Sequence, residues 1–227
     1  MNATHPIQAV IFDVDGTLYQ TERVAVPAFR RTFEDLRNES LYDGETPSED
    51  RILSCFGMTI PELWETLLPD ADMNVRDRAN EMLAHHEIAL MKEGEGRLYK
   101  GVRKVLTSLH NRNIPLFVCS NGEKRYVDTV LKTTGICSLF TQCYAAGAYK
   151  TEKKSDLLAI LLRDHDLINA QAVMVGDRKS DITAGIDNRI PTVGCDFGFA
   201  GEDELAQATV KIKSFDELSD ILDQLVR

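Results

Sequence analysis

Two carboxylates one residue apart, Asp13 and Asp15, directly follow the short apolar run 9–12, which is rich in β-branched and aromatic residues. Such a run is typical of a buried strand, and Gly16 then permits a sharp turn. Ligands of open α/β sheets bind beyond the carboxyl ends of the strands, where both acids can turn into one crevice. They indicate a cation site or a nucleophile with its acid–base partner, although Asp-Gly also occurs in ordinary turns.

A second polar group follows the apolar run 114–119. Ser120, Asn121 and Gly122 place a hydroxyl, an amide and a flexible backbone before a predicted helix. Because the N-terminus of a helix favours anions, these residues are suited to holding an anionic oxygen. Plain N-cap chemistry explains them equally well when they are considered alone.

Two further charged segments lie in the second half of the chain. Asp177 and Asp181 follow the strand-like run 172–175 at a helix start, where acids also complement the helix dipole. The lysine-rich loop 149–154 precedes another predicted helix, and such charge runs are usually solvated surface. Each segment has a simple explanation on its own. Since all four polar segments, around Asp13, Ser120, the lysine-rich loop and Asp177, lie at the carboxyl ends of predicted strands, together they predict one site.

The elements that must position these residues change character along the chain. Over 20–98 apolar residues recur at helical spacing, with proline and glycine between the segments. Beyond residue 98 strands alternate with helices, which implies right-handed βαβ units and a parallel sheet covered on both faces. The predicted strands are 9–12, 114–119, 140–146, 172–175, 192–194 and 210–212, and the predicted helices after the insertion are 101–111, 123–134, 155–164, 179–188 and one from 214.

We therefore predict an α/β fold, a Rossmann-like doubly wound parallel sheet with an inserted α-helical cap. Residues 1–19 and 98–227 would form the catalytic core, and residues 20–97 the cap. The turn 56–59, between two cap helices, is a candidate substrate contact, with simple cap packing as the alternative.

Composition limits the functions that this chain can have. Its 227 residues, 43% hydrophobic and 27% charged, are ordinary for a soluble globular protein. A net charge of -10 argues against non-specific binding to nucleic acids or anionic membranes. We find no apolar run long enough to span a bilayer and no signal-peptide pattern. The five scattered cysteines suggest reduced thiols, as in a cytoplasmic protein. Together with the net charge and the absence of a spanning run, they lead us to expect a cytoplasmic protein that binds neither nucleic acid nor membrane.

The order and spacing of the four motifs resemble the haloacid dehalogenase-like (HAD) hydrolase superfamily. The block 13–17 is similar to its first motif, Ser120 to its second, a lysine before a helix to its third, and Asp177 with Asp181 to its fourth. The early helical insertion is similar to the type-1 cap of the superfamily. Within it, the phosphoglycolate-phosphatase-like subgroup is the most similar one.

The residue types and the resemblance imply the same chemistry. Asp13 would attack phosphorus and form an aspartyl-phosphate, while Asp15 would protonate the leaving alcohol and then activate water. Mg²⁺ would be held by Asp13, the backbone carbonyl of Asp15 and Asp177, with Asp181 in an outer position. The phosphoryl oxygens would be held by Ser120, Asn121 and Gly122.

The identity of the motif lysine depends on where the following helix starts. Lys154 directly precedes the amphipathic run from residue 156, so we assign the role to Lys154, with Lys150 and Lys153 as alternatives. The loop departs from the Lys-Pro pattern that is commoner in the superfamily, which leaves the register open.

These features predict a HAD-like phosphoric monoester hydrolase, a Mg²⁺-dependent phosphatase of a small phosphorylated metabolite. The candidate substrates are of the phosphoglycolate, nucleotide and sugar-phosphate types. The expected oligomeric state is a monomer or a homodimer. Dehalogenase members of the superfamily lack an acid at the position of Asp15, so the resemblance implies phosphoryl transfer rather than carbon–halogen cleavage. The alternative is a phosphosugar mutase that uses the same aspartyl-phosphate. A phospho-acceptor signalling module is more remote, because such modules carry the phosphorylated residue after a later strand and lack a large cap.

Overall fold

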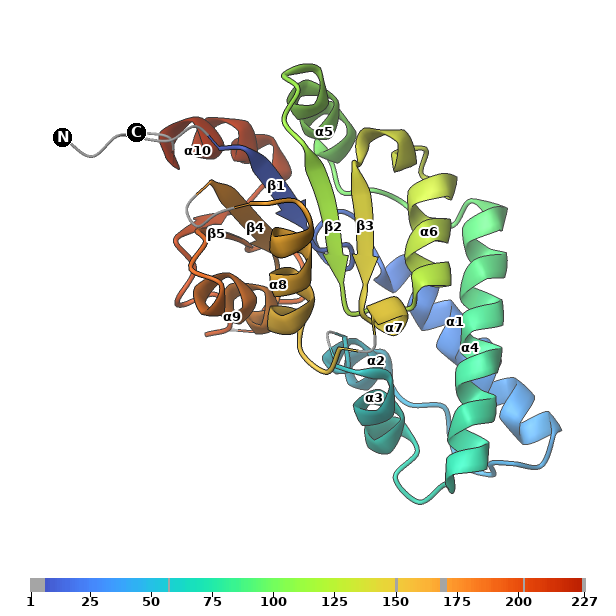
Figure 1. The fold of residues 1–227 in the computed structure, drawn as a ribbon. Coiled ribbons are helices and arrows are strands. Elements are labelled where there is room, and N and C mark those ends of the chain that lie inside the picture. Colours follow the sequence, from blue (N-terminus) through green and yellow to red (C-terminus); the bar gives the residue numbers. More distant parts are fainter. Residues whose placement is uncertain (1–6, 57, 150, 168–170, 202, 226–227) are drawn as a thin grey trace.

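The computed structural model describes residues 7–56, 58–149, 151–167, 171–201 and 203–225. Its centre is a sheet of six parallel strands in the order β3-β2-β1-β4-β5-β6 (Figure 1). The strands are β1 (Ala9–Phe12), β2 (Leu116–Ser120), β3 (Gln142–Ala145), β4 (Ala172–Gly176), β5 (Thr192–Cys195) and β6 (Val210–Ile212). The order runs outward in both directions from β1, which is the doubly wound topology that the sequence predicted.

The centre of the sheet is buried on both faces because β1 and β4 are apolar at every position rather than at alternate ones. Val10 and Phe12 of β1 belong to one apolar cluster, whereas Ala9 and Ile11 belong to a second cluster on the opposite face. Helices cover both faces, and they are α5 (Val102–Asn111), α6 (Lys124–Thr133), α7 (Ala146–Tyr149), α8 (Lys154–Asp164), α9 (Lys179–Asp187) and α10 (Leu218–Leu225), with 3₁₀ turns at Cys137–Leu139 and Phe215–Glu217.

Four helices are inserted between β1 and α5, namely α1 (Glu22–Asn38), α2 (Glu49–Ser54), α3 (Ile60–Leu67) and α4 (Met73–Glu93). Side chains fix where they begin: Ser48 and Asp72 accept hydrogen bonds from backbone N–H groups of α2 and α4, and Thr59 forms a capping box with Glu62. Gly94 ends α4 in the left-handed conformation. Figure 1 shows α2 and α3 beyond the carboxyl ends of the strands.

The two connections between the insertion and the sheet lie together. Tyr19 forms a β-bridge with Leu98, so the chain enters and leaves the insertion at one place. We propose on this basis that residues 20–97 form a cap domain and that residues 1–19 and 98–227 form the core.

The predicted elements agree with the structure to within a few residues, with one addition. The short helix α7 follows β3 directly and was not predicted, and Lys154 is the first residue of α8 rather than the last residue of a loop. None of the described helices is both long and apolar enough to cross a membrane.

Candidate active site

The candidate site lies at the carboxyl ends of β1, β2 and β4 and contains a buried ion-pair network. The Nζ atom of Lys154 lies 3.0 Å from Oδ1 of Asp13 and 2.6 Å from Oδ1 of Asp181. Burial disfavours the charged lysine, yet the charges of Asp13 and Asp181 raise the pKa of Lys154 above its ordinary value. The charged form of Lys154 is therefore favoured, and its ammonium group bridges the two carboxylates.

The start of α8 determines which lysine enters this network. Lys153 is the extended N-cap residue and is exposed, whereas Lys154, on the first turn, is buried. Lys150 lies outside the described residues. Of the two candidates that the structure describes, Lys153 and Lys154, it is Lys154 that contacts Asp13.

A group of three buried carboxylates lies beside the lysine. One oxygen each of Asp13, Asp177 and Asp181 lies within 4.8 Å of the other two. Burial, followed by the charge of Asp181, raises the pKa of Asp177 to about 7. Burial likewise raises the pKa of Asp13, despite the opposing charge of Lys154. Three acids with one lysine carry excess negative charge, so oxygen donors of this kind fit a hard divalent cation such as Mg²⁺.

The hydrogen bonds of the acids separate their positions. Asp181 accepts from Lys154 at Oδ1 and from the backbone N–H of Arg178 at Oδ2, 2.9 Å away, so both of its oxygens have protein partners. Asp177 accepts from the hydroxyl of Thr17 at 3.0 Å and from the N–H of Phe199 at 2.7 Å. Both acids therefore have protein donors at both oxygens, but Asp181, unlike Asp177, forms an ion pair with Lys154, which is compatible with an outer position for Asp181.

Gly16 makes the close approach of these segments possible. It has a φ of 71°, in the left-handed region, and a Cβ atom at this position would collide with the carboxylate of Asp177. The turn after β1 can therefore lie directly against Asp177 only because residue 16 is glycine.

Asp15 is held by two hydroxyl groups on the same oxygen. Its Oδ1 accepts from Thr21 at 2.5 Å and from the phenol of Tyr126 at 2.6 Å. Burial raises the pKa of Asp15, while these two hydrogen bonds oppose the rise. With Oδ1 engaged, Oδ2 is the oxygen left to exchange a proton with a ligand.

Sequence reasoning missed both hydroxyls. Tyr126 lies on α6, 111 residues from Asp15, and no local pattern connects the two. Thr21 lies only six residues from Asp15, but at a position that the sequence marks merely as the entrance to the insertion.

The predicted anion-binding residues lie on the same edge of the sheet. Ser120 is buried at the end of β2, and its hydroxyl accepts from the N–H of Gly122 at 3.0 Å. The helix that follows starts two residues after Gly122, at Lys124. Ser120, Asn121 and Gly122 all line the cavity described next, as do Asp13, Asp15 and Lys154.

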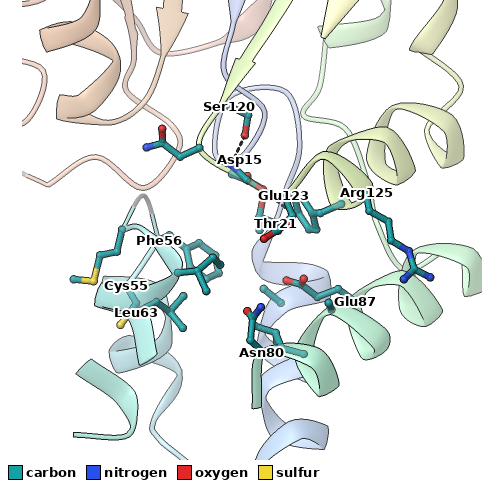
Figure 2. Close-up of a pocket in the computed structure, with 18 of the residues that line it drawn as sticks. Asp15, Thr21, Cys55, Phe56, Leu63, Asn80, Glu87, Ser120, Glu123 and Arg125 are labelled. Carbon is teal, nitrogen blue, oxygen red and sulfur yellow. Dashed lines mark hydrogen bonds between the residues drawn. The ribbon is translucent and has the colours of Figure 1, made fainter. Parts of the chain in front are cut away.

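A cavity of about 710 Å³ separates these residues from the inserted helices (Figure 2). Its floor is polar and belongs to the strand ends. Its opposite side, which we call the cap wall, is mostly apolar and comes from α1 to α4 and the turns between them. The cap wall includes Phe29, Cys55, Phe56, Ile60, Leu63 and Ile88.

The predicted turn at 56–59 does reach this cavity. Phe56 and Met58 line it, and the ring of Phe56 packs edge-on against Phe199 of the core with 4.7 Å between centroids. Gly57 lies outside the described residues. Trp64, by contrast, is buried within the helices and donates its indole N–H to Asn80 at 3.2 Å.

The fold and the site define an α/β enzyme of the doubly wound class, with an acidic site at the strand ends under inserted helices. The model of the haloacid dehalogenase-like hydrolase family matches residues 10–195. The chain therefore belongs to this family of hydrolases.

Individual relatives agree with this assignment. The chain is 29% identical over 208 residues to a phosphoglycolate phosphatase of Colwellia psychrerythraea, a match that covers 86% of this chain and 88% of the relative. It is 25% identical over 206 residues to the pyrophosphatase PpaX of Listeria monocytogenes, with 90% of each chain covered. A structure described as a predicted phosphoglycolate phosphatase from Haemophilus somnus superposes with a TM-score of 0.84 at 19% identity, covering 95% of this chain and 97% of that one.

Proposed function

We propose that this chain is a Mg²⁺-dependent phosphatase that hydrolyses a small phosphomonoester through an aspartyl-phosphate on Asp13. The observation that carries the proposal is the buried Lys154–Asp13 ion pair beside Asp177, at the floor of a cavity large enough for a metabolite. The relatives named phosphoglycolate phosphatase and pyrophosphatase support the reaction class.

In this proposal the core residues prepare Asp13 as a nucleophile. Asp13 attacks the phosphorus atom in line with the leaving oxygen, and its own oxygen–phosphorus bond replaces the ester bond. Lys154 stays protonated and compensates the charge of the carboxylate and of the incoming phosphoryl group. Asp13, the backbone carbonyl of Asp15 and Asp177 would hold Mg²⁺, which would supply further positive charge, and Asp181 keeps Lys154 in place.

Asp15 carries the proton in both halves of the reaction. Its free oxygen donates a proton to the leaving alcohol, and the resulting carboxylate then takes a proton from the water that hydrolyses the aspartyl-phosphate. Ser120, Asn121 and Gly122 hold the phosphoryl oxygens as charge redistributes, since they lie at the same cavity floor.

A phosphate-release assay with Mg²⁺ against phosphoglycolate, nucleoside monophosphates and sugar phosphates tests the proposal. We expect turnover that chelator abolishes and that Asp13→Asn eliminates, together with trapping of beryllofluoride on Asp13. Activity that survives thorough chelation, or label on another residue, would contradict it.

The same assay separates the two alternatives. A phosphosugar mutase forms isomeric sugar phosphate with little release of inorganic phosphate. A phospho-acceptor module becomes labelled by a phosphodonor without repeated turnover.

A further inference from the structure

The cap wall is mostly apolar, and its acidic and basic residues are Glu81, His85, Glu87 and Lys92 of α4. Glu87 lies on α4 and lines the cavity together with Ile88 and Leu63. Figure 2 shows its carboxylate facing the cavity, opposite Phe56 and below Asp15. The side chain is half-buried, so its charge is only partly exposed to solvent.

Of the other polar groups of the cap wall, Asn80 and Glu81 have partners within the protein, whereas His85 and Lys92 are exposed on α4. Asn80 accepts the indole N–H of Trp64, and Glu81, one turn and a half before Glu87, forms an ion pair with Arg78 at 3.4 Å. Within the described ranges, the carboxylate of Glu87 has neither a hydrogen-bond partner nor an ion pair. An acceptor of this kind in an apolar wall requires a donor from a ligand or from water.

The basic residues near the cavity do not neutralise Glu87. Burial, followed by the charge of Asp15, raises the pKa of Glu87 to about 8. Arg125 lies on the far side of Glu87 from Phe56 in Figure 2, and His85 and Lys92 are exposed on α4. Glu87 thus faces the cavity without an ion-pair partner among the described residues, and the nearby acid Asp15 favours the protonated form of Glu87 until a cation binds.

We propose that the cap wall selects a phosphorylated amino alcohol, with an apolar body that fills the cavity and an ammonium group that binds Glu87. The inference rests on the proposed phosphatase function and specifies its substrate class. Apolar side chains on either side of Glu87 match a hydrocarbon or aromatic body. A cation gives Glu87 the partner that the described residues do not supply, through a charge-assisted hydrogen bond.

The same arrangement disfavours anionic leaving groups. A substrate whose alcohol carries a carboxylate, as phosphoglycolate does, would place that charge against Glu87 on the cap wall. Repulsion in a site of low polarity lowers the affinity for such a substrate.

Three benzyl phosphates that differ only at the para position test the proposal. They are 4-(aminomethyl)benzyl, 4-ethylbenzyl and 4-carboxybenzyl phosphate, measured with Mg²⁺ at pH 8, with p-nitrophenyl phosphate as a reference. For the wild type we expect kcat/KM of the amine to exceed that of the ethyl compound about tenfold, and the carboxylate to be the poorest of the three.

Glu87→Gln should reduce the preference for the amine over the ethyl compound to less than about twofold while leaving the ethyl compound nearly unchanged. Glu93→Gln is the matched control, because Glu93 lies on the same helix, outside the cavity, 3.8 Å from Arg31. It should keep the full preference.

Equal kcat/KM for the amine and ethyl compounds in the wild type would overturn the inference, and this comparison needs no variant to fold. A preference that persists in Glu87→Gln would do the same. Hydrolysis of p-nitrophenyl phosphate without hydrolysis of any benzyl phosphate would leave the phosphatase function intact and refute the substrate class. Absence of all phosphatase activity would instead refute the proposed function.

Discussion

The floor of the cavity and the cap wall are built in opposite ways. At the floor, both oxygens of Asp181 and both oxygens of Asp177 accept hydrogen bonds, and Lys154 bridges Asp13 and Asp181. The cap wall is apolar apart from a few groups, of which Glu87 has no protein partner among the described residues. A dense polar network fixes one geometry, whereas an apolar wall accepts any body of suitable shape. We infer that the floor sets the reaction and that the cap wall sets the substrate.

The two regions meet at Phe199. Its backbone N–H donates to Asp177 at the floor, while its ring packs against Phe56 of the cap. A change in the position of the cap relative to the core would therefore alter the surroundings of Asp177, a candidate metal ligand.

The largest expected effect, and the one that best distinguishes the floor from the cap wall, comes from replacing Lys154. Lys154→Met removes the buried positive charge at Asp13, and we expect kcat to fall by roughly a thousandfold or more. Lys153→Met, the matched control on the exposed neighbour, should retain nearly full activity. Steady-state phosphate release measures both, with circular dichroism to establish folding. If Lys153→Met is the inactive variant, the assignment of the floor is wrong.

Tyr126→Phe should have the next largest effect, and one that depends on the leaving group. Without the phenol, Asp15 loses one of the two hydrogen bonds that fix Oδ1. We expect kcat/KM for an alkyl phosphate to fall about tenfold, and that for p-nitrophenyl phosphate to change less than about twofold, since p-nitrophenolate leaves without a proton. Tyr144→Phe, which removes a hydroxyl bonded to Asp164, should leave both values unchanged. Equal losses on the two substrates would show that Tyr126 does not act through Asp15.

The contact between the regions should give a smaller effect. Phe56→Ala and Phe199→Ala each break the same aromatic pair, so each should lower kcat/KM by about fivefold, and the double variant should be no worse than either single one. Phe140→Ala, which disturbs the edge-on pair with Phe12, serves as the control and should leave kcat/KM unchanged. Additive losses in the double variant would mean that the pair does not couple the cap to the core.

The smallest expected effect is on stability. In the folded protein the pKa of Glu87 is about 8, above its ordinary value of 4.5, so the folded state binds the extra proton between these values. Stability from this group is present below about pH 4.5 and is lost as the pH rises through 8. In the presence of chelator, the Tm of the wild type should fall between pH 6 and 9 by a few degrees more than the Tm of Glu87→Gln. The difference is small because the Glu87 side chain is partly exposed to solvent. Glu93→Gln should follow the wild type.

Local sequence patterns were sufficient for the strands, the inserted helices and the positions of the motif acids. Apolar runs such as 9–12 define buried strands because a strand covered on both faces needs apolar side chains at each position. Once the strands are parallel, their carboxyl ends share one edge. Asp13, Ser120 and Asp177 therefore had to lie near one another, whatever the details of packing.

Tertiary structure alone decided which groups complete the site. The helix register selected Lys154 over Lys153, and the packing of α6 brought Tyr126 to Asp15. The placement of α4 left Glu87 facing the cavity, with no partner in the part of the chain that the structure describes. Hydrogen bonds and compensated charges depend on ångström distances between segments that are remote in the chain, while hydrophobic periodicity depends only on neighbours along it.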